Sequence, residues 1–94
     1  MTWERSDGLR NIGHDSRHVV CSRTYTPPGK VYPRITLALY DFQGIDGGYR
    51  FTCDRKESIR SNWVAASIPE SLLHEAWLLL AEGQALLLTR KETP

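Results

Sequence analysis

Residues 67–90 read SIPESLLHEAWLLLAEGQALLLTR, and this stretch decides the fold class. Ser67 and Glu70 have the S-x-x-E spacing of a capping box, in which each side chain accepts a backbone N–H at the start of a helix. Pro69 falls in the first turn, where its missing N–H costs little. Apolar residues then recur at helical spacing, so the sequence predicts a helix over about 68–82.

The segment after this helix predicts a strand. Gly83 is typical of a helix end, and the run Leu86 to Leu88 favours a strand over 85–90. Another short strand is expected over 63–66, just before the helix. A helix that connects two strands of one sheet normally makes them parallel, so the sequence predicts one parallel pair.

An antiparallel meander is expected upstream of the helix. Runs rich in β-branched and aromatic residues predict the strands, and two turn signals separate them. Pro28 and Gly29 suit the central positions of a type II turn, and Asp46-Gly47 is a strong hairpin signal. The predicted strands span residues 18–26, 31–42 and 49–55.

Together these elements predict an α+β fold. It consists of a mixed, mainly antiparallel sheet of four to five strands, with the helix packed on one face. Residues 1–94 are expected to form a single domain, because a chain of this length supports one modest core. Residues 1–17 are rich in glycine and charge with scattered apolar side chains, so we expect an N-terminal arm that packs on the domain.

Composition excludes several classes. A hydrophobic content of 40% argues against disorder, and a net charge of +1 gives no bulk attraction to nucleic acid or membranes. No apolar run approaches the ~20 residues that span a bilayer, so no membrane partner is expected. The first residues contain no apolar stretch typical of a secretory signal. Cys21 and Cys53 lie far apart without a C-x-x-C pattern, which favours a reduced cytoplasmic protein with two core cysteines.

Alternation of side chains along the meander predicts two unlike faces of the sheet. An aliphatic face is the expected bed for the helix, and it holds Val20, Val31, Ile35, Leu37 and Leu39. The helix is expected to meet it with Leu72, Leu73, Ala76, Trp77, Leu79 and Leu80.

The second face is predicted to be aromatic, with both cysteines and two arginines. One helix cannot cover both faces, and large exposed apolar patches often mark interaction sites. Leu78 adds to this expectation, because helical spacing places it on the polar side of the helix. The predicted interaction surface comprises Arg23, Tyr25, Tyr32, Arg34, Tyr40, Phe42, Tyr49, Phe51 and Leu78.

The predicted register sets Arg23 opposite Arg34, and like charges in that position are unfavourable. Either the register is shifted, for which Pro33 offers a reason, or an anion lies between the two side chains. We favour the shifted register.

No motif predicts catalysis, a metal site or a cofactor. His14 and His18 have the i, i+4 spacing of zinc-binding histidines, but Gly13 precedes them and a strand follows at once, so no helix can hold them. The sequence contains no glycine-rich phosphate loop, no paired-carboxylate signature and no Ser-His-Asp spacing.

The sequence therefore predicts a small non-enzymatic protein-interaction module that forms a homodimer or binds a larger protein. Short domains of this kind often belong to phages or mobile elements, which favours an accessory protein of such an element. One alternative is a nucleic-acid-binding module that uses Arg23, Tyr32, Arg34, Tyr40 and Phe51. The other is a small-molecule-binding protein or enzyme with a pocket between sheet and helix, lined by His74, Cys53 or Asp54.

Overall fold

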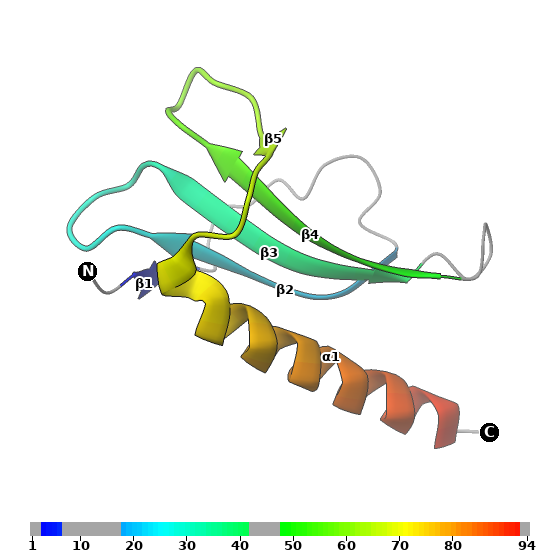
Figure 1. Ribbon diagram of the computed structural model, residues 1–94. Coiled ribbons are helices and arrows are strands. Elements are labelled where there is room, and N and C mark those ends of the chain that lie inside the picture. The colour runs from blue at the N-terminus through cyan, green and yellow to red at the C-terminus, as the bar shows by residue number, and fades with distance from the viewer. Residues whose placement is uncertain (1–2, 7–17, 42–47, 93–94) are drawn as a thin grey trace.

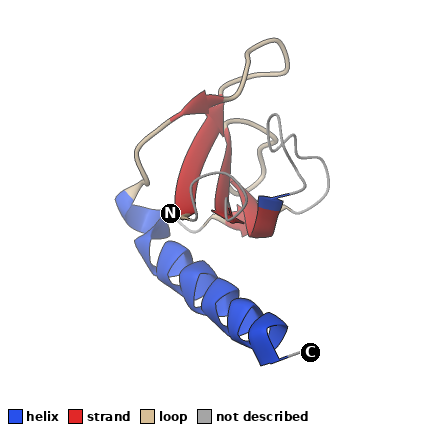
Figure 2. Cartoon of the chain, turned by 90° about the vertical axis from the view of Figure 1, so that its right-hand side faces the viewer, coloured by secondary structure: helices blue, strands red, loops and turns tan. Residues whose placement is uncertain are grey.

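A computed structural model describes residues 3–6, 18–41 and 48–92 of the chain (Figure 1). One sheet holds five strands in chain order, and every neighbouring pair is antiparallel. A 3-10 turn, η2, leads into a single long helix, α1, on one face of the sheet (Figure 2). The elements are β1 (Glu4–Arg5), β2 (Val19–Thr26), β3 (Arg34–Asp41), β4 (Tyr49–Lys56), β5 (Val64–Ala65), η2 (Glu70–Leu72) and α1 (Leu73–Glu92).

The α+β class, a sheet of four to five strands and one helix in the C-terminal half are thus confirmed. The meander is also close to its predicted bounds, because β-branched and aromatic runs form β2, β3 and β4. The turn after β2 is the predicted type II turn. Lys30 N–H donates to the Pro27 carbonyl over 3.1 Å, and Gly29 has the positive φ of +72° that this turn requires.

The predicted register of the meander is wrong in both hairpins. The connection from β2 to β3 continues through residues 31–33, so Tyr25 lies opposite Ile35 instead of Tyr32. Between β3 and β4 the pairing is shifted by one residue, and Tyr49 lies opposite Asp41. A shift of one residue moves every side chain of a strand to the other face.

The corrected register defines an inner face, toward α1, and an outer face. Ile35, Leu37 and Leu39 lie on the inner face and form the core with α1, as predicted. Val31 instead lies in the turn and is exposed. The inner face also carries Cys21, Arg23, Tyr25, Phe51 and Cys53, and the outer face carries Ser22, Thr24, Thr36, Ala38 and Tyr40.

The helix does not stop at Gly83, and the predicted strand over 85–90 is wrong. Gly83 is buried in the middle of α1, where a Cβ atom would lie 2.5 Å from Leu39 Cδ2 and 3.1 Å from Cys21 Sγ. The residue is glycine because the helix backbone approaches the sheet closely, and it marks no helix end. With residues 85–90 helical, the predicted parallel pair is also wrong, since all described strand pairs are antiparallel.

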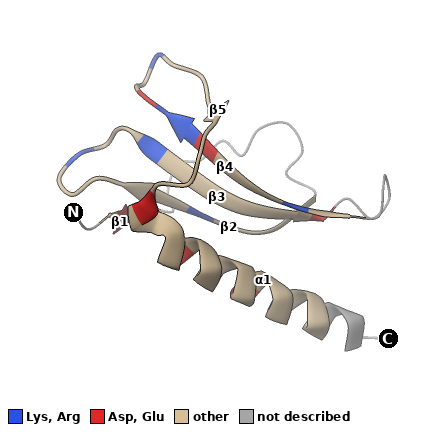
Figure 3. Ribbon diagram, viewed as in Figure 1, with Lys and Arg blue, Asp and Glu red and all other residues tan. Residues whose placement is uncertain are grey.

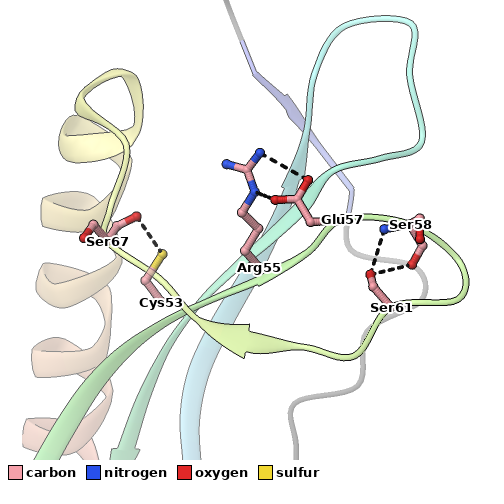
Figure 4. Close-up of polar contacts among 6 residues, drawn as sticks. All are labelled: Cys53, Arg55, Glu57, Ser58, Ser61 and Ser67. Atoms are coloured by element: carbon pink, nitrogen blue, oxygen red, sulfur yellow. Dashed lines mark hydrogen bonds and ion pairs between the residues drawn. The ribbon is translucent and has the colours of Figure 1, made fainter.

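The predicted capping box does not form either. The first helical turn begins after Pro69 and has no side-chain cap. Ser67 lies before this turn, and its carbonyl accepts a hydrogen bond from Cys53 Sγ at 3.7 Å (Figure 4). Ser67 therefore ties the segment between β5 and the helix to the inner face of β4.

Of the predicted N-terminal arm, the structure describes Trp3–Ser6, and the remainder of 1–17 lies outside the described residues. Trp3 packs against the core, and its indole N–H donates to Ser71 Oγ at 2.6 Å. The adjoining strand β1 pairs with the end of β2. Trp3 thus lies beside Ser71 at the start of the helical segment, and the packing of the whole arm over 1–17 stays a prediction. None of the helices in the described part of the chain is both long and apolar enough to cross a membrane.

Candidate interaction site

Most of the exposed large hydrophobic side chains in the described part of the chain lie on α1. Five of the nine belong to this helix. Trp77 is 69% exposed, and it would normally be among the most buried residues of a domain this size. The other four are Leu73, Leu78, Leu86 and Leu88.

This exposure arises because α1 is apolar on more than one side. The side that faces the sheet holds Ala76, Leu79 and Gly83 of α1, and Leu72 at the end of η2 continues the same buried stripe at helical spacing. After Gly83 none of the side chains up to residue 89 is buried, and α1 diverges from the sheet toward its C-terminal end (Figure 1). The last turns of α1 therefore hold apolar side chains with no sheet beneath them.

The two flanks of α1 face different parts of the sheet. One flank faces β2, because Glu82 contacts Arg23 and Glu75 contacts Tyr25. At 100° per residue, Trp77 lies on the opposite flank, on the side of β4. The helix packs chiefly on β2 and β3. β4 lies beyond the part of the sheet that α1 chiefly covers, and its Tyr49 is 44% exposed.

A small hollow lies on the β2 side, between β1, β2 and α1. It measures about 170 Å³ and is lined by Leu78 and Leu79 together with polar side chains from β1, β2 and α1. Arg23 Nη2 lies 2.5 Å from Glu82 Oε1, and the Tyr25 hydroxyl donates to Glu75 Oε2 at 3.2 Å. Burial, together with the charge of Glu75, raises the pKa of Tyr25 to about 12. Pockets for small molecules usually measure roughly 300–1,000 Å³, so the hollow is small for such a ligand.

The residues considered for a ligand pocket do not converge. His74 is exposed on α1, and Cys53 is buried on the inner face of the sheet. Asp54 lies on the outer face, opposite Thr36 in the strand register. Burial raises the pKa of the Cys53 thiol to about 11, and the charge of Asp54 adds to the shift. A thiol with a raised pKa is a poor nucleophile.

Cys21 is likewise a buried thiol with a raised pKa. Its Sγ donates to the Leu79 carbonyl at 3.6 Å, and burial raises its pKa. Both cysteines are buried and outside any disulfide. The prediction of two core cysteines is therefore confirmed.

The predicted interaction surface is divided among several places. Arg23, Tyr25 and Leu78 come together at the hollow. Tyr49 and Phe51 lie on the inner face of β4, away from that group. Arg34, at the start of β3, lies beside Tyr32 of the preceding connection, whereas Tyr40 is near the other end of β3 on the outer face. Phe42 lies outside the described residues.

Sequence reasoning placed Trp77 and Leu73 against the sheet, and the structure leaves both exposed. Two apolar stripes run along η2 and α1 with the same helical spacing. One passes through Leu72, Ala76 and Leu79, and the other passes through Leu73, Trp77 and Leu80. The signal that could have separated them is Gly83, because only the first stripe contains a residue small enough for close approach to a sheet.

Positive charge gathers at one end of the sheet, where β3 begins and β4 ends (Figure 3). Arg34 and Lys56 are directly opposite each other across these strands. Arg34 also lies over the Tyr32 ring, 4.9 Å from its centroid, and Lys56 Nζ donates to the Ser61 carbonyl. Arg55 pairs with Glu57 in the same region, at 2.5 Å (Figure 4).

Across residues 3–6, 18–41 and 48–92, no cluster of three or more His, Cys, Asp or Glu side chains could hold a metal ion. His14 lies outside the described residues, so its predicted lack of a metal role stays a prediction. Comparison of the chain with protein-family models, with curated proteins and with solved structures finds no match.

Proposed function

We propose that the chain is a small non-enzymatic protein-interaction module that self-associates through the exposed side of α1. The observation that carries this proposal is Trp77, which is 69% exposed on a helix whose opposite side fills the core. Leu73 and Leu88 lie on the same exposed side of the helix, at 46% and 55%.

The magnitude of the exposed surface supports association. A whole Trp side chain can bury about 250 Å², so Trp77 leaves roughly 170 Å² in water. At about 25 cal/mol per Å², covering that area contributes at most roughly 4 kcal/mol, against which the entropic cost of association must be set. Apolar patches of several hundred Å² on a protein surface commonly mark contacts with another chain.

A second copy is the partner we propose first. In a two-fold dimer the same patch serves both chains, so every contact between one residue and another across the interface occurs twice. A larger protein with an apolar face is the other partner that this surface would fit. Two buried thiols outside any disulfide suit a reducing compartment, and we propose the cytoplasm. A role as an accessory protein of a phage or mobile element stays a prediction.

The native mass of the purified chain across a concentration series tests this function. We expect a dimer for the wild-type chain and a monomer for Trp77→Glu. Ile59→Glu is the matched control, because Ile59 is 76% exposed but lies in the loop after β4. It should remain dimeric. A wild-type monomer at all concentrations, or a Trp77→Glu variant that stays dimeric, would contradict the proposal.

A second candidate function is binding of single-stranded nucleic acid at the basic end of the sheet. The observation that favours it is the position of Arg34 and Lys56, which lie directly opposite each other across β3 and β4 and so bring two positive charges to this end of the sheet. Tyr32 beside Arg34 offers a ring for base stacking. Affinity for a single-stranded oligonucleotide should fall steeply as the salt concentration rises. The variant Lys56→Gln should also bind more weakly than the wild-type chain. Absence of binding at low salt would end this candidate.

A further inference from the structure

We propose that the basic end of the sheet binds the surface of an anionic lipid bilayer. Two loops form this end, one over residues 27–33 between β2 and β3, and the other over residues 57–63 between β4 and β5. We call them the end loops. The inference does not depend on self-association through α1, because it concerns a different surface.

The end loops are far apart in the sequence but leave the sheet at the same end. β3 begins at Arg34, directly opposite Lys56, where β4 ends. The first loop therefore enters the sheet where the second loop departs from it. Figure 1 shows both loops projecting beyond the strands at this end. A flat partner can contact both loop tips at once.

Each end loop exposes one aliphatic side chain next to a basic one. Val31 is 58% exposed and follows Lys30, and Ile59 is 76% exposed and precedes Arg60. Ile59 is the most exposed large hydrophobic residue in the described part of the chain. One such side chain alone would be ordinary. The same pair of residue types on both loops fits a partner whose negatively charged surface overlies an apolar layer, which is the structure of an anionic bilayer.

The charge at this end is opposite in sign to that of the remaining chain. Residues 27–34 and 55–63 contain five Lys or Arg residues and one acidic residue, which gives a net charge of +4. The whole chain carries +1, so the remainder carries −3. The bulk charge, from which no attraction to membranes was expected, averages over these two regions. Figure 3 shows the basic residues in the end loops and at the adjoining strand ends. A cluster of about four to eight Lys and Arg residues is typical of segments that bind anionic lipids.

An aromatic residue accompanies each aliphatic tip. Tyr32 follows Val31, and Trp63 closes the second loop, with both rings half-buried. Tyr and Trp are enriched at membrane–water interfaces because each combines an apolar ring with one polar group. A nucleic acid would use the positive charge and the Tyr32 ring, but it offers no apolar layer for the two aliphatic tips. The combination of residues therefore favours lipid as the partner of this end.

Hydrogen bonds within the end loops hold their tips in place. Ser58 N–H donates to Ser61 Oγ at 2.8 Å, and this hydroxyl donates to the Ser58 carbonyl at 3.0 Å (Figure 4). Lys56 Nζ donates to the Ser61 carbonyl. In the first loop, Lys30 N–H donates to the Pro27 carbonyl at 3.1 Å. Because the tips are already ordered, contact with a bilayer requires little further loss of conformational entropy.

Co-sedimentation with lipid vesicles tests the inference. We expect the purified chain to bind phosphatidylcholine vesicles that contain about 25% phosphatidylserine, and to bind pure phosphatidylcholine vesicles far more weakly. Val31→Ser/Ile59→Ser should weaken binding about tenfold or more, because it removes the side chains that enter the apolar layer. Lys30→Gln/Arg60→Gln should weaken it roughly 20-fold through the loss of two charges.

Leu78→Ser and Arg50→Gln are the matched controls for these variants. Leu78 and Arg50 are exposed but belong to α1 and to the start of β4, away from the end loops. Each control should bind the anionic vesicles within about twofold of the wild-type chain, because charges farther away than a Debye length are largely screened.

Three outcomes would overturn the inference. One is absence of binding to the phosphatidylserine vesicles by a chain with the circular dichroism spectrum of a folded protein. Another is vesicle binding that Val31→Ser/Ile59→Ser leaves unchanged. The third is binding to a poly-thymidine oligonucleotide without binding to vesicles, which would assign this end to nucleic acid. None of these outcomes bears on self-association through α1, which the native mass tests separately.

Discussion

The two sides of α1 carry the same kinds of residue and have different environments. Leu72 and Leu79, which face the sheet, are 0% and 2% exposed, whereas Leu73 and Leu78, each next to one of them in sequence, are 46% and 51% exposed. The sheet can cover only one side of the helix, so the exposed apolar side chains elsewhere on α1 contribute little to the core. Exposed apolar side chains gathered on one helix are expected where a partner covers them. The comparison separates residues that stabilise the domain from residues that are available for association.

The sharpest test of this comparison is a matched pair of truncations. Leu79→Ala should lower the free energy of unfolding by about 2–5 kcal/mol, because it leaves a cavity in the core. Leu78→Ala, one residue away and half-exposed, should change it by less than about 1 kcal/mol. Urea denaturation at one protein concentration measures both. Equal losses would mean that the two sides of α1 are not distinct.

Gly83 tests how closely α1 approaches the sheet. Gly83→Ala should destabilise the protein by about 1–2 kcal/mol, because the added Cβ would clash with the buried Leu39 and this outweighs the gain in helix propensity. Ala85→Gly is the control on the exposed side and should cost up to about 1 kcal/mol through propensity alone. Thermal denaturation of both variants gives the signs. A more stable Gly83→Ala would contradict the close approach.

The outer face of the sheet contains buried polar side chains, in contrast to the apolar core on the inner face. Thr24 and Thr36 are buried there, with their hydroxyl oxygens 3.0 Å apart. Thr24→Val should cost about 1–2 kcal/mol, since it leaves a buried hydroxyl without this partner. The double variant Thr24→Val/Thr36→Val should cost less than the sum of the two single changes. Strict additivity in the double-mutant cycle would show that the two hydroxyls do not interact.

The smallest effect is expected at the ion pair on the β2 side of α1. The side chains of Arg23 and Glu82 are 22% and 42% exposed, so solvent screens their attraction. Glu82→Gln should therefore cost no more than about 1 kcal/mol at low salt. The difference from wild type should shrink in 1 M NaCl. A larger cost that persists at high salt would indicate that this flank of the helix stabilises the fold more than its exposure implies.

Local chemistry was sufficient to predict much of the fold. β-branched and aromatic runs gave strands β2 to β4, and Pro28-Gly29 gave the type II turn. Register was not predictable, because it depends on where the connection ends, and residues 31–33 extend the first turn beyond its sequence signal. Gly83 was misinterpreted for a similar reason. A glycine at a helix end and a glycine at a close contact look alike until Leu39 is placed beside it.

The candidate site was predicted only in part. Leu78 was expected to be exposed, and it is. Trp77 and Leu73 were assigned to the core, because their stripe has the same spacing as the stripe that faces the sheet. Hydrophobicity alone cannot choose between two equivalent stripes. The choice depends on the small residues Ala76 and Gly83, which let one side of α1 approach the sheet.

The most direct test of the central claim is the solvent access of Trp77 itself. In a Trp3→Phe/Trp63→Phe variant, Trp77 is the sole tryptophan, and acrylamide quenching of its fluorescence can be followed through a dilution series. Our account predicts that Trp77 is shielded at high protein concentration and becomes strongly quenched on dilution, with a midpoint that matches the change in mass. Equal and strong quenching at every concentration would contradict it.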